Sequence, residues 1–169
     1  MSPAQSTVSR EYAIKAAFLY NFGQYVRWPA NAFGDPGDPF VIAVLGPDPF
    51  GETLNVIAST KRLGGRNVVI QRIDALEPEP EARCHILFIP DGVATPRQLE
   101  AMGRFRGAPV LVVGETPGFT GRGGAIELYI RHNKVRFRID RQAAGEHQLA
   151  ISSRLLDLEK RWEEESSRD

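Results

Sequence analysis

Hydrophobic and polar positions alternate strictly in two short runs near the C-terminal end of the chain, residues 125–131 and 134–139. Alternation with a period of two is typical of strands that are buried on one face. The two runs are separated by only two residues, so together they predict a β-hairpin. The positions expected to face inward are Ile126, Leu128, Ile130, Val135, Phe137 and Ile139.

The charges of the hairpin favour one register. A two-residue loop at 132–133 places Glu127 opposite Arg138. Moving the loop by one residue would place Arg131 opposite Arg136, and like charges directly opposite each other are destabilising. His and Asn, which occupy the loop, also tolerate the positive φ angles of tight turns. We therefore predict the first register, with an outer face of Glu127, Tyr129, Arg131, Arg136 and Arg138 that is either a solvated face or a patch for an anion or a partner.

A long, largely apolar stretch, residues 11–28, predicts a first helix. Ser9 is placed to cap it, and Pro29 is expected to end it because the residue before a proline avoids the helical region. Its apolar side chains cover most of the circumference, which indicates burial on more than one side. Arg27 and Trp28 would then lie at the helix exit, where Arg27 either complements the helix dipole or holds an anionic ligand.

Other runs complete the predicted fold. Apolar runs at 40–45, 84–89 and 110–113 predict strands covered on both faces, and residues 67–73, with an apolar core at 68–70, predict another strand. Between and after them, helices are expected at 50–60 with an Asp48 cap, at 95–106 with a Thr95 cap, at 140–147, and at 154–164 with a Ser152 or Ser153 cap. Strands that alternate with helices predict an α/β fold with a parallel sheet, to which the hairpin adds antiparallel strands at one edge.

A chain of 169 residues is long enough for one domain with a substantial core. We expect residues 11–162 to form that domain, residues 1–10 to be a flexible N-terminus and residues 163–169 to be a frayed tail. The first nine residues are small and polar and lack the build of a signal peptide. They are compatible with a cytoplasmic protein or with a mature form that carries an added start methionine.

Charge argues against two classes of partner. Lys and Arg number 21, as do Asp and Glu, so the net charge is zero. Nucleic-acid binders usually carry a basic excess, and an attraction to anionic membrane surfaces also needs one. No apolar run approaches the roughly 18 residues that a membrane-spanning helix requires. The composition therefore predicts no nucleic-acid partner and no membrane span.

The residue types that carry catalysis form no recognisable pattern. His85, His132 and His147 are far apart and lack the spacing of metal ligands. Ser152 follows no strand-and-glycine pattern of a serine hydrolase. Cys84, the single cysteine, begins a buried run where a thiol is usually inert. We therefore expect no catalytic residue, no metal and no cofactor, and we predict that the protein is not an enzyme.

Four segments together carry a resemblance to a known family. They are KAAFLYNF at 15–22 followed by YVRWP at 25–29, CHILFI at 84–89, GGAI at 123–126 leading to KVRFRID at 134–140, and LAISSRLL at 149–156. In this order and spacing the chain resembles the YfiR-like family, which is also described as a domain of unknown function. The resemblance covers nearly all of residues 12–158.

The resemblance implies a bacterial periplasmic protein that is often a homodimer. It implies a Rossmann-like three-layer α/β fold with a mainly parallel sheet. It also implies a regulatory role, in which the protein binds the periplasmic sensor region of a membrane-bound diguanylate cyclase and lowers cyclic di-GMP synthesis and biofilm formation. An outer-membrane lipoprotein can sequester such a repressor. The family's paired cysteines are incomplete here, because Cys84 has no counterpart near Ala43.

Two surfaces follow as candidates. The resemblance at 151–156 favours a partner-binding surface near the C-terminal end, made by Ile151, Arg154, Leu155 and Leu158, with Arg27 and Trp28 nearby if the helix exit packs there. The alternative is a sensor of a small anionic ligand, a nucleotide or an amino acid, held by Arg27, Trp28, Arg136 and Arg138. A third class, an enzyme of unseen chemistry, would require the histidines to converge with carboxylates in space.

Overall fold

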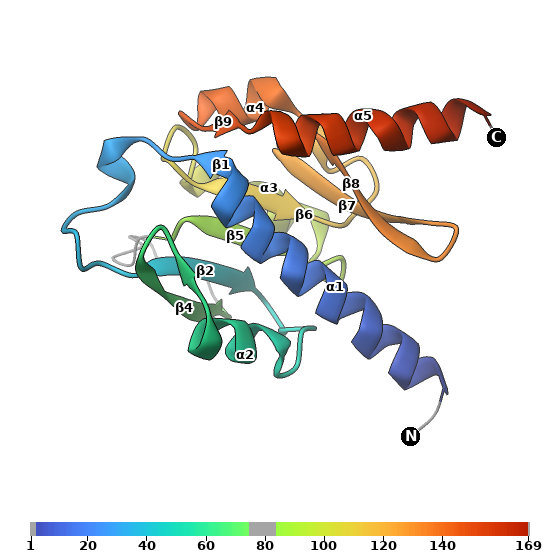
Figure 1. Cartoon of the computed structure of the whole chain (residues 1–169), viewed down its shortest axis with the longest axis horizontal. Helices are drawn as coiled ribbons and strands as arrows, with labels where there is room; N and C mark the ends of the chain where they lie inside the picture. The colour runs from blue at the N-terminus through green and yellow to red at the C-terminus, as the bar shows by residue number, and fades with distance from the viewer. Residues whose placement is uncertain (1–2, 75–83, 169) are drawn as a thin grey trace.

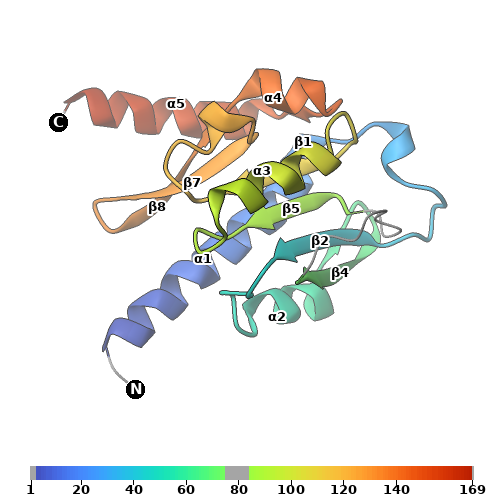
Figure 2. The same cartoon turned by 180° about the vertical axis from the view of Figure 1, so that it is seen from behind.

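A computed structural model describes residues 3–74 and 84–168. Within these residues a seven-stranded sheet, seen from two sides in Figure 1 and Figure 2, has the order β3-β4-β2-β5-β6-β7-β8. Strand β1 pairs with β9 in a separate small sheet (Figure 1). The strands are β1 (Val26–Arg27), β2 (Phe40–Leu45), β3 (Arg62–Leu63), β4 (Arg66–Ile73), β5 (Ile86–Ile89), β6 (Leu111–Gly114), β7 (Ile126–Arg131), β8 (Lys134–Ile139) and β9 (Ala150–Ile151). The helices are α1 (Pro3–Tyr25), α2 (Thr53–Thr60), α3 (Thr95–Arg104), α4 (Arg141–Glu146) and α5 (Ser153–Arg168), with 3-10 turns η1 (Ala30–Ala32) and η2 (Thr120–Arg122).

The large sheet is mixed. Its centre is parallel, because β2 runs parallel to both β4 and β5, β5 to β6, and β6 to β7. The two ends are antiparallel, through the β3–β4 pair and the β7–β8 pair. The expectation of an α/β fold is confirmed, while the mainly parallel description holds for the centre alone. The short strand β3 was not predicted, because two residues are too few to show a period.

The hairpin has the predicted register. Glu127 lies opposite Arg138, Leu128 opposite Phe137, and every other pair follows the two-residue loop at 132–133. Both loop residues adopt positive φ, 51° for His132 and 60° for Asn133. The register therefore agrees with the prediction from opposite charges and turn chemistry. Ile130 was expected to face inward, but it is 47% exposed near the tip of the hairpin.

The first helix differs from the prediction at both ends. It begins at Pro3, eight residues before the expected start, and Pro is well suited to the first helical turn because its missing N–H needs no partner there. It ends at Tyr25, so Arg27 is not at a helix terminus as we expected. Val26 and Arg27 instead form β1, which pairs with β9. Pro29 does end the helical region, but a strand pairing ends the helix earlier.

The other helix ends also shift. Asp48 accepts a hydrogen bond from Phe50 N at 2.7 Å and so caps a turn that precedes α2, which begins only at Thr53. The N-cap of α3 is Ala94 and not Thr95. Ser152 caps α5 as predicted, because its carbonyl and hydroxyl accept from the first backbone N–H groups of that helix. The helix continues to Arg168, beyond the predicted end near residue 164.

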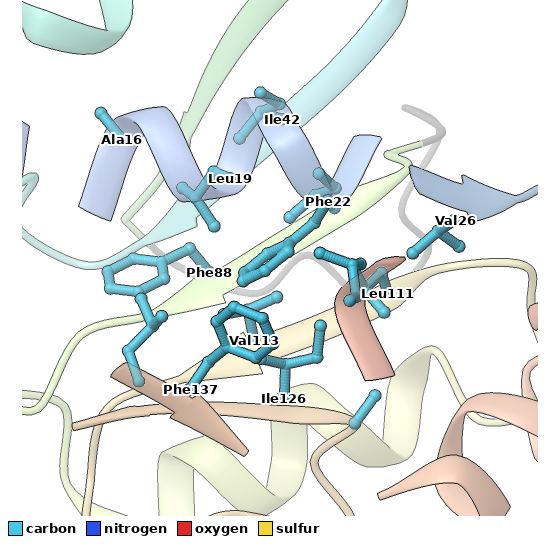
Figure 3. Close-up of a cluster of buried hydrophobic side chains, with 14 of the residues drawn as sticks. Ala16, Leu19, Phe22, Val26, Ile42, Phe88, Leu111, Val113, Ile126 and Phe137 are labelled. Atoms are coloured by element: carbon cyan, nitrogen blue, oxygen red, sulfur yellow. The ribbon is translucent and has the colours of Figure 1, made fainter. Parts of the chain in front are cut away.

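The larger core lies between the sheet and helices α1, α2 and α5. Phe137 of β8 is at its centre, with ring centroids 5.5 Å from Phe18, 5.1 Å from Phe22 and 4.7 Å from Trp162. All three are edge-to-face contacts, the arrangement that aromatic quadrupoles favour. Figure 3 shows Leu19 and Phe22 of α1 directed at this part of the sheet. The cluster therefore joins α1, the hairpin and α5.

The second core lies on the opposite face, under α3. Phe119 is fully buried there and lies against the backbone of Gly114 and Gly124. A Cβ atom at Gly114 would approach the Phe119 ring to 2.6 Å, and one at Gly124 would overlap the same ring. Gly114 and Gly124 therefore make room for an aromatic side chain.

Gly124→Ala is expected to destabilise the fold by about 1–3 kcal/mol, because the methyl group must displace a buried ring that cannot move into free space. Gly121→Ala is the matched control, since no atom lies within 4 Å of the point that its new methyl group would occupy and its φ is not positive. Urea unfolding of both variants measures the difference. Equal stability of the two variants would contradict the packing argument.

The carboxylate of Glu159 links α5 to the hairpin, since it accepts a hydrogen bond from Ile139 N. Burial raises the pKa of Glu159, and the neighbouring Glu163 carboxylate acts in the same direction, although the Ile139 N–H and Arg138 oppose it. A raised pKa means that the folded protein holds this proton to a higher pH than the unfolded chain does. The resulting stabilisation is complete at low pH and is lost as the pH rises through the folded-state pKa.

Glu159→Gln removes this titration while it keeps an oxygen that can accept from Ile139 N. The stability of Glu159→Gln relative to wild type is therefore expected to increase from pH 4 to pH 7. Denaturant unfolding at several pH values measures this difference. Glu164→Gln, at an exposed position of the same helix, is the control and should show a smaller dependence on pH. A decrease for Glu159→Gln would overturn the assignment.

Candidate functional site

The exit of α1 and the start of α5 meet in the small β1–β9 sheet. Val26 lies opposite Ile151 and Arg27 opposite Ala150, while Ser152 N donates to Tyr25 O at 2.9 Å. We call the segments 24–27 and 150–154 the β1–β9 corner; it lies where the first helix ends beside the last one (Figure 1). The end of α1 thus packs against the C-terminal segment, which is the arrangement required for Arg27 to lie near that segment.

Arg154 is an exposed cation of the corner. Its Nη1 donates to Tyr25 Oη at 3.2 Å, and its guanidinium lies 5.3 Å from the centroid of the Tyr25 ring. Arg27 is also exposed, and no described residue forms an ion pair with it. The corner therefore presents two guanidinium groups beside an aromatic ring.

A cleft lies along the small sheet. Its volume is about 540 Å³. The residues that line it are Gln24, Tyr25, Val26, Arg27, Ala150, Ile151, Ser152 and Ser153. Sequence reasoning missed Gln24 and Tyr25, because a two-residue strand leaves no periodic signal and the pairing joins segments more than 120 positions apart.

The predicted partner residues divide into a surface group and a supporting group. Arg154 is exposed and Ile151 is half-buried. Leu155 is only 4% exposed and belongs to the core, where it holds α5 in place. Leu158 is half-buried against the same core. Partner binding by these four residues stays a prediction.

Arg27 and Trp28 point in different directions, as consecutive residues of an extended chain do. Arg27 remains at the corner, whereas Trp28 turns inward. Trp28 Nε1 donates to Gly23 O at 3.3 Å, and its ring lies 5.3 Å from Phe40 and 6.0 Å from His85. Trp28 thus anchors the strand that carries Arg27.

The structure does not bring Arg136 and Arg138 to Arg27. Arg136 Nη2 lies 3.2 Å from Glu165 Oε2, near the C-terminal end of α5, whereas Arg27 lies beside its N-terminal end. With a rise of 1.5 Å per residue, these two positions along the helix are roughly 18 Å apart. The residues predicted to hold an anion therefore do not meet at one place, because Arg27 and Arg136 lie at opposite ends of α5.

Both hairpin arginines also have partners within the fold. The Arg136 guanidinium lies 4.8 Å from the Trp162 ring, and that of Arg138 lies 4.2 Å from the Tyr129 ring. Arg138 Nη1 is 3.7 Å from Glu127 Oε2, and Glu127 is buried although we expected it on a solvated face. These contacts favour a structural role for the two arginines.

A buried polar cluster at the carboxyl ends of β5 and β6 was not predicted. Lys15 Nζ lies 2.6 Å from Glu115 Oε1 and 2.6 Å from Glu11 Oε2, and the side chains of Lys15 and Glu115 are nearly inaccessible. The second Glu115 oxygen accepts from Tyr12 Oη and from Asp91 N, both at 2.9 Å. Burial and the Glu115 charge raise the pKa of Tyr12, so its hydroxyl stays protonated and donates. The sequence signal that could have indicated this cluster is Lys15, which lies in a largely apolar helix.

Both oxygens of the central carboxylate, that of Glu115, accept hydrogen bonds within the cluster. Each oxygen of Glu115 is bonded, and the Lys15 cation is compensated by two carboxylates. Such an arrangement stabilises a buried charge because the partners and hydrogen bonds replace its hydration. We therefore interpret the cluster as a tie between α1 and the sheet.

The three histidines remain apart. Both ring nitrogens of His85 contact backbone atoms, with Nδ1 accepting from Val41 N at 3.0 Å and Nε2 at 2.9 Å from Ala32 O. His147 Nδ1 is 2.8 Å from Ala108 O, and His132 lies in the hairpin loop. Among the described residues, no group of three or more His, Cys, Asp or Glu side chains is placed to hold a metal ion.

Cys84 has the environment of an inert thiol. It is 4% exposed in the second core, and burial raises its pKa to about 12. A thiol that keeps its proton is a poor nucleophile, because the thiolate is the reactive form. Ala43, where a pairing cysteine was expected from the resemblance, is fully buried on β2.

Comparisons with known proteins agree with the sequence motifs. No helix in the described part of the chain has the length and apolar character needed to cross a membrane. A comparison with curated proteins finds no match. The YfiR/HmsC-like family matches residues 12–159, a range that includes α1 from Tyr12 onward, the whole large sheet and the β1–β9 corner. The resemblance drawn from the four sequence segments is therefore confirmed, and the chain belongs to the YfiR/HmsC-like family.

Proposed function

We propose that this protein is a non-enzymatic periplasmic regulator that binds the periplasmic sensor region of a membrane-bound diguanylate cyclase and represses it. Lower cyclic di-GMP synthesis and reduced biofilm formation would follow. Family membership supports this proposal. The Rossmann-like three-layer description of the fold belongs to the same proposal; the parallel centre of the sheet and the helices on both faces support it.

The β1–β9 corner is the partner-binding surface in this proposal. The observation that carries it is the exposed Arg154 guanidinium on Tyr25, beside Arg27 and the half-buried Ile151. Arg and Tyr are enriched among residues that dominate protein interfaces, because they combine a large contact area with directional hydrogen bonds. Buried Leu155 and half-buried Leu158 fix the helix beneath this surface.

The corner also suggests the charge of its partner. Arg27 and Arg154 are both exposed, and no described carboxylate neutralises either of them. Guanidinium groups pair with carboxylates through parallel hydrogen bonds. We therefore expect an acidic segment on the cyclase to dock here. An outer-membrane lipoprotein that sequesters the repressor would compete for the protein, and homodimer formation belongs to the same proposal.

Ligand sensing remains the alternative function. Of the four predicted residues, Arg27 alone faces the 540 Å³ cleft of the corner, and it is an exposed cation without an ion-pair partner among the described residues. A nucleotide or an amino acid with an anionic group would fit this chemistry. A thermal-shift screen of such compounds tests the alternative, and stabilisation lost in Arg27→Ala would favour it.

Arg154→Glu is expected to weaken cyclase binding by tenfold or more, because an acidic partner would then face a negative charge. Its thermal midpoint should change little, since exposed contacts such as the one with Tyr25 contribute about 0–1 kcal/mol. Co-purification from solubilised envelopes of the native host measures binding. The control is Lys160→Glu, which makes the same charge change at another exposed position of α5. Loss of folding in Arg154→Glu would show a structural residue instead.

Purified protein added to the reconstituted cyclase is expected to lower cyclic di-GMP production, and Arg154→Glu should restore it. Leu155→Ala provides a contrast, because truncation of a buried leucine typically costs about 2–5 kcal/mol of stability. Its repression should fail only under conditions where it unfolds. A cyclase whose activity is unchanged by wild-type protein at saturating concentration would reject the proposed repression.

A further inference from the structure

A second hollow lies away from the corner, between α1 and α2. It has a volume of about 690 Å³, within the range of about 300–1,000 Å³ that is common for small-molecule sites. Its lining is mostly apolar. The apolar side chains that line it include Ala13, Ala17, Tyr20, Phe50, Val56 and Ile57.

This α1–α2 groove is elongated. On α1 its wall extends from Ser9 to Asn21, which corresponds to about 18 Å along the helix at 1.5 Å per residue. The α1 side consists largely of small side chains, so an occupant can approach the helix closely. The opposite wall is branched and exposed, since Val56 is 55% accessible. An apolar groove of this length fits an extended alkyl chain.

The two ends of the groove differ in charge. At one end the ring centroids of Phe50 and Tyr12 are 5.5 Å apart. Glu52, which precedes the first turn of α2, lies at the same end. Lys61 follows the last turn of α2, and its Nζ lies 5.4 Å from the centroid of the Tyr20 ring at the other end. Among the described residues no carboxylate forms an ion pair with Lys61.

We propose that the α1–α2 groove binds a medium-chain fatty acid, with the carboxylate at Lys61 and the alkyl chain directed toward Phe50. The charge difference sets this orientation, because Glu52 would repel an anion at the opposite end. The chain would cover Val56 and Ile57, which the fold leaves partly exposed. This site is distinct from the β1–β9 corner and does not depend on the function proposed for it.

Chain-length dependence tests the alkyl channel. Isothermal titration calorimetry with octanoate, decanoate and dodecanoate, all below their micellar concentrations, is expected to show affinity rising about fourfold for each added methylene. Val56→Trp should fill the channel and weaken dodecanoate binding more than tenfold. Val69→Trp is the control, because Val69 is 44% exposed on β4 and is not part of the groove. Unchanged binding by Val56→Trp would overturn the site.

Head-group charge tests the carboxylate assignment. Wild-type protein should prefer dodecanoate over dodecyltrimethylammonium, and Lys61→Glu should reverse this preference. Lys134→Glu, an exposed lysine of the hairpin, makes the same change in net charge and should leave the preference as in wild type. Circular dichroism melting of every variant separates loss of binding from loss of folding. Equal binding of both head groups to the wild type would overturn the assignment.

Discussion

The edge-to-face contacts of Phe137 are the interaction on which the rest of this structure depends. Its ring contacts Phe18 and Phe22 of α1 and Trp162 of α5, so one side chain of the hairpin joins the first and last helices. Such pairs contribute about 0.5–1.5 kcal/mol each beyond their buried area. Their larger effect here is geometric, since they place two helices that are remote in sequence against the same strand.

The β1–β9 corner follows from that placement. A pairing of two residues on each strand is too short to be stable alone, because isolated two-stranded sheets are marginal even when longer. It forms because α1 and α5 are already fixed by the aromatic cluster and because Trp28 anchors the end of β1. The candidate binding surface is thus a product of tertiary packing and has little local stability of its own.

Sequence patterns predicted the elements whose stability is local. The hairpin register followed from Glu127 opposite Arg138 and from a loop tolerant of positive φ. The predicted C-terminal end of α1 was wrong, because the end of the helix at Tyr25 depends on the pairing of β1 with β9 and not on Pro29 alone. The separation of Arg136 from Arg27 also depends on tertiary packing. The charge pattern along a strand does not reveal that Arg136 reaches Glu165 of α5. Exposed Arg154 and buried Leu155 are neighbours in sequence, and only the direction of the helix separates their roles.

Helix α1 connects the buried polar cluster, the α1–α2 groove and the β1–β9 corner. Its Lys15 is paired with Glu115 at the carboxyl ends of the strands, its small residues line the α1–α2 groove, and its exit forms the corner. Removing one partner of a buried ion pair typically lowers the free energy of unfolding by about 3–5 kcal/mol, so the pair of Lys15 and Glu115 holds α1 firmly to the sheet. A helix anchored in its middle resists sliding along the sheet. An occupant of the groove would therefore affect the corner only through local changes at the end of α1, where Gln24 and Tyr25 line the cleft.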